Sequence, residues 1–167
     1  MAGPPRFSPD KILAVLMRHR VDFVLIGGLA ALAHGSNIPT LDVDITPNPD
    51  VGNLDRLSAA LTELEAEVRF GDEALPFSHN GESLANAGVW NLRTVFGDLN
   101  ISMIPNGTQG YPDLIRDASD VAILDVVVPT SSLADVIRSK QAANRPKDQR
   151  VLPVLREILA SRHARNT

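Results

Sequence analysis

The chain has 167 residues, of which 44% are hydrophobic and 22% are charged, and its formal net charge is −4. These proportions exclude a collagen-like, coiled-coil or wholly disordered chain, and the lack of cysteine excludes disulfides and thiolate sites for zinc or iron–sulfur clusters. No apolar run reaches the ~18 residues that cross a bilayer, and the first residues lack the apolar core of a signal peptide. We therefore expect one cytoplasmic domain over residues 1–167 with no membrane partner.

Hydrophobic periodicity and turn residues predict alternating helices and strands. In the first half of the chain we expect a helix over 9–20 capped by Ser8, a strand over 21–26, a short helix over 29–35, a strand over 40–46, a helix over 53–69 and a polar loop over 71–88. In the second half we expect paired strands over 90–95 and 98–104, a loop over 106–114 leading into a short helix to about 118, and a strand or hairpin over 121–128. Two helices complete the chain, one over 133–144 capped by Ser131 or Ser132 and one over 152–165 with Pro153 in its first turn. This mixture predicts an α/β or α+β fold, a small mixed β-sheet flanked by helices.

Charge is distributed unevenly along the chain. From Arg138 to the C-terminus, eight Lys or Arg residues stand against two acids, whereas the preceding part is strongly acidic. A basic tail of this kind, which we call the basic C-terminal segment (131–167), indicates an anionic ligand such as a nucleotide phosphate or RNA. A solvated amphipathic helix explains the same charges equally well. The short tract 145–148 has the same two readings, an exposed turn or a contact to nucleotide or RNA.

The sharpest motif is Asp42-Val43-Asp44 in the strand predicted over 40–46. Side chains at positions i and i+2 of a strand project from the same face, so the two carboxylates lie side by side. Their mutual repulsion is relieved by a divalent cation, and Mg²⁺ binds carboxylate oxygens together with substrate phosphate oxygens. Acidic residues are also common on solvent-facing strands, so this motif alone is a weak signal.

The residues before this pair strengthen the metal hypothesis. Gly27-Gly28 ends a predicted strand and opens a helix, which is where backbone N–H groups approach a phosphate closely. A Gly-Gly pair alone is more often a plain turn. Here it is followed by the small residues Gly35-Ser36 and then by the acidic strand, an order that chance rarely supplies.

The sequence resembles the minimal nucleotidyltransferases of the DNA-polymerase-beta-like superfamily, and most closely the AbiEii/MenT-like toxin nucleotidyltransferases. The similar stretches are 23–45, 97–115 and 136–155, in the family's order and spread over most of the chain. This resemblance implies the nucleotidyltransferase fold and the transfer of a nucleoside monophosphate from a nucleoside triphosphate (NTP) to an acceptor. Typical P-loop and Rossmann fingerprints are absent.

The resemblance also implies which residues bind the nucleotide. Gly27, Gly28 and Ser36 match the turn and the small hydroxyl that contact the phosphates. Thr40 matches the position that shapes the approach to the metal. In relatives an arginine commonly stands where this chain has Ile38, so one phosphate contact is missing here.

A second group of residues matches the family's catalytic positions. Asp42 and Asp44 correspond to the ligands of Mg²⁺ or Mn²⁺, and Lys140 to the lysine that neutralises triphosphate charge. Asp148 either orients Lys140 or helps to activate the acceptor. Asn100 takes the metal-binding position of the family's third acid, although an amide binds a cation more weakly than a carboxylate and is not a base. Asp98, two residues earlier on the same face of the strand, is an alternative candidate for that acid.

Several functions therefore stay open. The leading hypothesis is a bacterial toxin of a toxin–antitoxin system that transfers a nucleotide to the 3′ end of tRNA, with a cognate antitoxin as partner. The substitution at Asn100 favours a degenerate, non-catalytic protein of the same fold that binds or regulates. Transfer to a small molecule such as an aminoglycoside, or to a protein hydroxyl, is the third hypothesis.

The other chemically capable residues are assigned to structure. His34 is predicted to pack at a helix end, and Trp90 and Phe96 are predicted to belong to the core. Four histidines without paired spacing do not form a zinc site, and no nucleophile elbow for a serine hydrolase is present.

Overall fold

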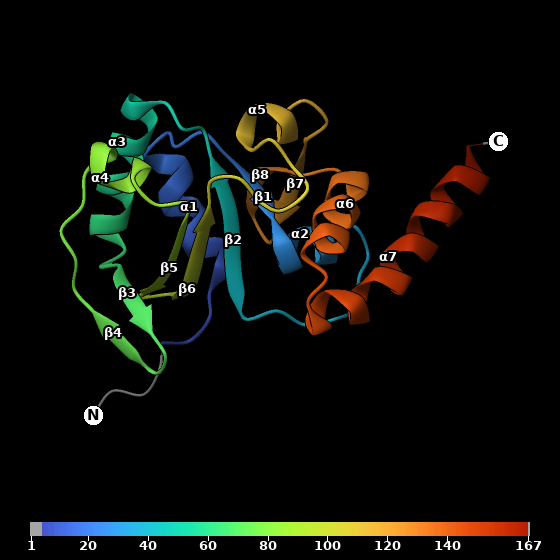
Figure 1. Ribbon diagram of the computed structural model, residues 1–167, viewed down its shortest axis with the longest axis horizontal. Coiled ribbons are helices and arrows are strands. Elements are labelled where there is room, and N and C mark those ends of the chain that lie inside the picture. The colour runs from blue at the N-terminus through green and yellow to red at the C-terminus, as the bar shows by residue number, and fades with distance from the viewer. Residues whose placement is uncertain (1–4, 167) are drawn as a thin grey trace.

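A computed structural model describes residues 5–166 (Figure 1). Its strands are β1 (Phe23–Ile26), β2 (Asp42–Pro47), β3 (Glu67–Phe70), β4 (Glu73–Leu75), β5 (Val89–Thr94), β6 (Gly97–Ser102), β7 (Ser119–Ile123) and β8 (Val126–Thr130). Its helices are α1 (Pro9–Arg18), α2 (Gly27–Ala33), α3 (Val51–Glu63), α4 (Gly81–Ala85), α5 (Tyr111–Leu114), α6 (Leu133–Ala143) and α7 (Pro146–Arg165). None of these helices combines the length and the apolar composition that a membrane span requires.

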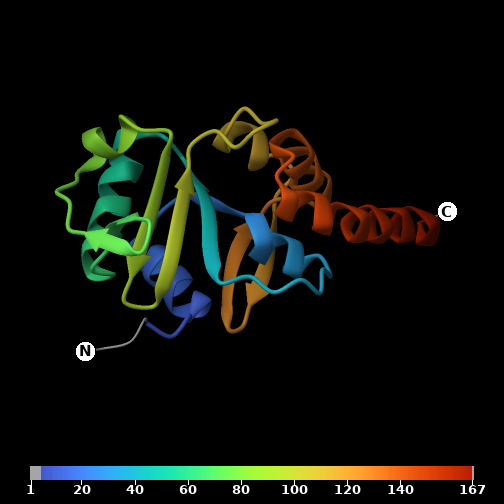
Figure 2. The same ribbon diagram turned by 60° about the horizontal axis from the view of Figure 1, so that its bottom comes forward.

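The strands form one eight-stranded sheet in the order β4-β3-β5-β6-β2-β1-β8-β7. β2 is parallel to β6 and β1 is parallel to β8, whereas the other neighbours are antiparallel. The mixed sheet with flanking helices confirms the predicted fold class. Figure 2 shows the C-terminal half of α7 extending away from the rest of the molecule, as it also does in Figure 1.

Two hydrophobic clusters hold the helices against the sheet. The larger joins α1 and α3 to one face through Val43, Ile45, Leu99 and Ile101, all of which are buried. The smaller joins α2, α6 and α7. Because side chains alternate along a strand, burying Val43 and Ile45 directs Asp42 and Asp44 to the opposite face, beside α2 and α6.

The pairing of the central strands places polar residues side by side. Asp44 on β2 lies opposite Ile26 on β1, the residue just before Gly27. On its other side β2 pairs with β6, with Asp42 opposite Asp98 and Asp44 opposite Asn100. The Gly-Gly turn, the two aspartates and the position of the third acid therefore meet at the centre of the sheet.

Several predicted boundaries in the first half of the chain are wrong. The helix predicted over 53–69 ends at Glu63, because Glu65 has a left-handed backbone (φ 51°) that lets the chain turn into β3. The loop predicted over 71–88 contains β4 and α4. α2 begins at Gly27 rather than at residue 29, so both glycines belong to its first turn.

Boundaries in the second half differ as well. α5 ends at Leu114. Of the two alternatives for 121–128, the hairpin is confirmed, although it extends over β7 and β8 and its outer strand β7 is largely exposed. Ser132, not Ser131, caps α6, because its side chain accepts a hydrogen bond from the Asp135 N–H. The last helix starts at Pro146 instead of residue 152. Pro153 consequently lies inside α7, where its ring faces solvent rather than the core.

Candidate active site

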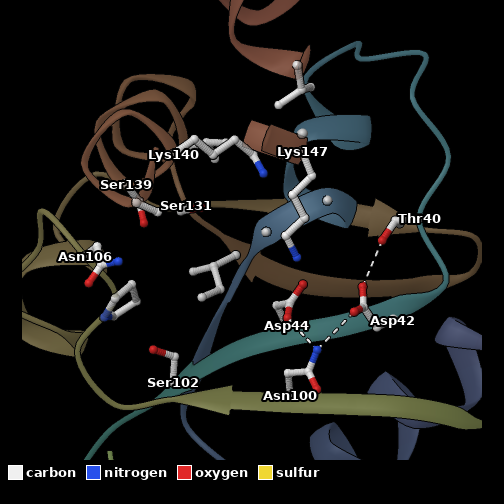
Figure 3. Close-up of a pocket in the computed structure, with 18 of the residues that line it drawn as sticks. Thr40, Asp42, Asp44, Asn100, Ser102, Asn106, Ser131, Ser139, Lys140 and Lys147 are labelled. Carbon is white, nitrogen blue, oxygen red and sulfur yellow. Dashed lines mark hydrogen bonds between the residues drawn. The ribbon is translucent and has the colours of Figure 1, made fainter. Parts of the chain in front are cut away.

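A cavity of about 450 Å³ lies between the sheet and the pair α6–α7 (Figure 3). One end is charged, with the aspartates of β2 facing lysines of both helices. The other end is lined by Ser102, Asn106 and Ser139, and by Asp135 one helical turn before Ser139. The cavity therefore offers a region with both aspartates and lysines beside a second polar region.

The two aspartates share one hydrogen-bond donor. Asn100 Nδ2 donates to Asp42 Oδ2 at 3.0 Å and to Asp44 Oδ1 at 3.1 Å. The Thr40 hydroxyl donates to Asp42 Oδ1 at 3.0 Å. Burial and the nearby charge of Asp42 raise the pKa of Asp44 to about 6, although Asn100 and two lysines partly oppose this shift. The pair thus carries negative charge that its neighbours only partly compensate.

Gly27 leaves room for this pair. Its backbone has a φ of +70°, and a Cβ at this position would overlap Asp44 Oδ2. A Cβ on Gly28 would lie 2.7 Å from the Thr40 hydroxyl oxygen. The two glycines therefore let the chain pass directly over the acidic strand, which a side chain would prevent.

Replacing Gly27 by alanine should destabilise the protein by about 1–2 kcal/mol, because an L side chain is strained in the left-handed region. The overlap with Asp44 should in addition weaken any metal-dependent stabilisation measured by urea unfolding. Gly71→Ala is the matched control, since Gly71 also has a positive φ (+61°) but nothing within 4 Å of its Cβ position. An equal response of both variants to Mg²⁺ would refute the proposed role of Gly27.

Two lysines and Arg145, the residue just before α7, supply positive charge to the cavity. Lys140 on α6 and Lys147 on α7 line the cavity, and both lie near enough to Asp44 to act on its charge. Burial lowers the pKa of Lys140, and the nearby carboxylates of Asp148 and Asp44 oppose that shift. Lys147 was not singled out from the sequence, because the tract 145–148 is equally typical of an exposed turn.

Asp148 is fully buried beneath this cluster. It accepts hydrogen bonds from Arg145 Nε at 2.7 Å and from the Arg145 N–H at 3.1 Å, and its Oδ1 lies 3.6 Å from Lys140 Nζ. Burial disfavours its charged form, but these hydrogen bonds and charges outweigh burial and hold the pKa of Asp148 below its ordinary value. Of the two predicted roles, this placement matches orienting Lys140.

The remaining nucleotide-binding candidates lie at the rim of the cavity. Ser36 lines the cavity but is mostly buried, and its hydroxyl accepts a hydrogen bond from the Ile38 N–H at 3.2 Å. Ile38 is partly exposed at the same rim. The arrangement stabilises the loop before β2 and leaves the hydroxyl hydrogen of Ser36 able to donate to a phosphate oxygen.

Asp98 lies on the same face of the sheet as the aspartate pair, opposite Asp42, but arginines bind its carboxylate. Its carboxylate forms ion pairs with Arg69 at 3.5 Å and with Arg93 at 3.7 Å. Arg69 also donates a hydrogen bond to Asn100 Oδ1. Asp98 is therefore committed to the arginines, whereas Asn100 contacts both metal-binding candidates. Arg69 was missed from the sequence, because the segment around it was assigned to a helix.

His34, Trp90 and Phe96 make contacts that hold elements of the fold together, as predicted. His34 Nε2 lies 2.7 Å from the Ser131 carbonyl oxygen, and Arg162 contacts its other ring nitrogen, which ties α7 to α2. Trp90 and Phe96 pack against the larger hydrophobic cluster.

The donor set fits a small divalent cation. Among residues 5–166 no group of three or more His, Cys, Asp and Glu side chains is arranged to hold a metal, and the aspartate pair is the candidate carboxylate donor set. Mg²⁺ is commonly bound by one or two carboxylates plus substrate phosphates, and the cavity leaves space for phosphates beside the pair.

Added Mg²⁺ should stabilise the protein above about pH 7 and have little effect near about pH 5, where Asp44 is largely protonated. Without metal, the raised pKa of Asp44 means that stability is greatest below its unfolded pKa and falls as the pH rises through about 6. That fall is on the order of 3 kcal/mol. Urea unfolding with MgCl₂ or chelator at both pH values measures this difference. Asp44→Asn should remove it, and an equal Mg²⁺ effect at both pH values would contradict the assignment.

Comparison with known proteins adds information on the fold. No family model and no curated protein matches the chain. The lincosamide antibiotic adenylyltransferase LnuA, solved with lincomycin bound, is 15% identical, with a TM-score of 0.62 over 92% of this chain and 99% of that chain. The antibiotic-resistance factor ANT(2'')-Ia is 16% identical, with a TM-score of 0.52 over 92% and 90%. A candidate nucleotidyltransferase from Thermotoga maritima is 19% identical, with a TM-score of 0.50 over 90% and 89%.

The likeness to these structures covers nearly the whole chain in each case. At such low identity it establishes the architecture and leaves substrates and residue roles to be argued from this chain's own geometry. The chain has the nucleotidyltransferase fold.

Proposed function

We propose that the protein is a Mg²⁺- or Mn²⁺-dependent nucleotidyltransferase that moves a nucleoside monophosphate from an NTP to an acceptor hydroxyl, with residues 1–167 acting as one domain. The observation that carries the proposal is the charged end of the cavity. There Asp42 and Asp44 face Lys140 and Lys147 across the turn at Gly27. Carboxylates for a cation and ammonium groups for phosphates, held in one cavity, match the needs of phosphoryl chemistry.

In the proposed reaction, the acceptor oxygen forms a bond to the α-phosphorus while the bond from that phosphorus to the bridging oxygen breaks. The acceptor loses a proton and pyrophosphate leaves. Lys140 and Lys147 hold the phosphates and offset the charge that develops on the leaving group. Asp42 and Asp44 would hold the cation, which when bound polarises the phosphoryl oxygens and orients the triphosphate.

The resemblance to toxin nucleotidyltransferases supports the 3′ end of tRNA as acceptor, with a cognate antitoxin as regulatory partner. The basic C-terminal segment supports the same acceptor, because Arg150, Arg156 and Arg165 are exposed along α7. Guanidinium groups on a projecting helix suit the phosphates of a nucleic acid backbone. RNA binding by this surface should weaken as the salt concentration rises.

A small-molecule acceptor is the second candidate. It is favoured by the second end of the cavity, where serine and asparagine side chains and Asp135 offer hydrogen-bonding groups, and by the antibiotic bound in the LnuA structure. A degenerate binding protein is the alternative that the Asn100 substitution leaves open, and transfer to a protein hydroxyl is covered by the same experiment.

The deciding experiment is a transfer assay with each α-labelled NTP, MgCl₂ or MnCl₂, and either total tRNA, an aminoglycoside and lincosamide panel, or cell protein. We expect label on tRNA, and none with the double variant Asp42→Ala/Asp44→Ala. Label confined to the antibiotics selects the small-molecule acceptor. No label on any acceptor, with a folded protein, refutes the proposed catalytic function.

A further inference from the structure

Asn100 is held in one orientation by its two sets of neighbours. Its Nδ2 group donates to both Asp42 and Asp44, and its Oδ1 accepts from Arg69. A carboxylate is an acceptor and a guanidinium is only a donor. Rotating the amide by half a turn would set its oxygen against two carboxylates and its NH₂ against the guanidinium, so both sides oppose the rotation.

Arg69 is itself fixed, which makes this orientation a property of the sheet. Its Nε donates to the Leu92 carbonyl oxygen at 3.3 Å, and its Nη1 lies 3.5 Å from Asp98 Oδ2. Its side chain is only 24% exposed. The rigid planar guanidinium therefore meets three partners on three different residues, and one of these is Asn100.

The amide covers one side of the aspartate pair, and the other oxygens of the pair lie beside Thr40 and Gly27. Each carboxylate gives one oxygen to Asn100. The second oxygen of Asp44 lies beside Gly27, and the second oxygen of Asp42 accepts from the Thr40 hydroxyl. A cation can bridge these second oxygens on the cavity side, but an amide NH₂ offers no lone pair for a cation on its own side.

We propose that Asn100, oriented by Arg69, is a fixed hydrogen-bond donor that replaces a cation between Asp42 and Asp44 and limits the site to a single divalent ion. Asn100 and Arg69 are thus positioning residues, and the amide takes the place of a charge instead of binding a metal. The inference rests on the proposed function only in taking a divalent cation as the ligand of the aspartate pair.

The acceptor side of the reaction follows from this arrangement. With a single cation bound on the cavity side, no second ion lies at position 100 to lower the pKa of an acceptor hydroxyl. The Asn100 amide is also not a base. A group other than Asn100 must therefore take the proton from the acceptor hydroxyl. The carboxylate added in Asn100→Asp should create a second cation site at this position.

The number of cations is measured by titrating the whole protein with Mn²⁺ and following the electron paramagnetic resonance signal of free Mn²⁺. We expect one Mn²⁺ per chain in the wild type and two in Asn100→Asp. Asn91→Asp is the matched control, because Asn91 lies directly opposite Asn100 on β5 and lines the same cavity. It adds the same charge one strand away and should keep one Mn²⁺. Two Mn²⁺ in the wild type, or one in Asn100→Asp, would overturn the proposal.

Mn²⁺ affinity tests whether Arg69 orients the amide, because a residue that only stabilised the fold would not alter this affinity. Arg69→Met releases the Asn100 oxygen, which can then turn towards the cation, so Mn²⁺ affinity should rise by about tenfold, equivalent to about 1.4 kcal/mol. The stoichiometry should remain one. Unchanged Mn²⁺ affinity in a folded Arg69→Met protein would show that Arg69 does not orient the amide.

These titrations use neither nucleotide nor acceptor, so their outcome is separate from that of the transfer assay. A protein that binds one Mn²⁺ and transfers no label refutes the proposed function and leaves this inference standing. A protein that transfers label and binds two Mn²⁺ refutes this inference and leaves the proposed function standing.

Discussion

Replacing Asp148 by alanine is expected to destabilise the protein by about 3–5 kcal/mol, the range found when one partner of a buried ion pair is removed. Asp148 is fully buried, and its carboxylate joins Arg145 and Lys140. Without it, the largely buried ammonium of Lys140 loses its nearest counter-charge, and the first turn of α7 loses the acceptor of the Arg145 N–H. Urea unfolding at neutral pH measures the loss.

The pH dependence separates this charge effect from a packing effect. Because the pKa of Asp148 is lowered in the folded protein, its stabilising contribution is present above the unfolded pKa and disappears as the pH falls through the folded value. The difference between wild type and Asp148→Ala should therefore shrink in acid. A difference that stays constant in acid would indicate packing alone.

Two further variants complete this test. Asp148→Asn keeps an acceptor for Arg145 but not the charge, and should lose about 1–3 kcal/mol. Asp125→Ala, in the exposed turn of the β7–β8 hairpin, should change stability by less than about 0.5 kcal/mol. A loss below about 1 kcal/mol in Asp148→Ala would contradict the importance assigned to the buried pair.

The central part of the fold follows from local patterns. The alternation over 41–45 predicts a strand with both aspartates on one face, and the structure has that strand and that face. The helix predicted over 53–69 ran too far, because Leu61, Leu64 and Val68 continue a helical spacing. Val68 instead pairs with Leu92 in the sheet, a contact between distant segments that no local pattern contains.

The resemblance supplied Asn100, Lys140 and Asp148 as candidates, whereas Lys147 and Arg69 were missed and the burial of Asp148 was not expected. Proline at the first position and aspartate at the third are helix-start signals, and 146–148 carries both. Pro153 led us to place the start of the last helix later. Even with the correct start, a capping aspartate is normally exposed, so the burial of Asp148 depends on how α6 and α7 pack. The contact between Arg69 and Asn100 likewise depends on the order of the strands.

The last prediction concerns the two lysines of the cavity. Lys140→Met and Lys147→Met should each lower kcat by about 10²–10³-fold, the effect of removing one preorganised charged donor from a transition state. The expected loss is in kcat rather than in the KM for NTP, because charge on the leaving pyrophosphate increases as the bond to phosphorus breaks. Steady-state transfer kinetics with the identified NTP and acceptor give both constants.

Lys11→Met is the matched control, since the chain has a third lysine at position 11, on α1 over the Phe96 ring and outside the cavity. It should leave kcat unchanged. Because both cavity lysines act on one triphosphate, the double variant should lose less than the product of the single losses. If each lysine variant raised KM and left kcat intact, the lysines would bind the ground state alone. Stabilisation of the transition state would then have to come from the aspartates and their cation.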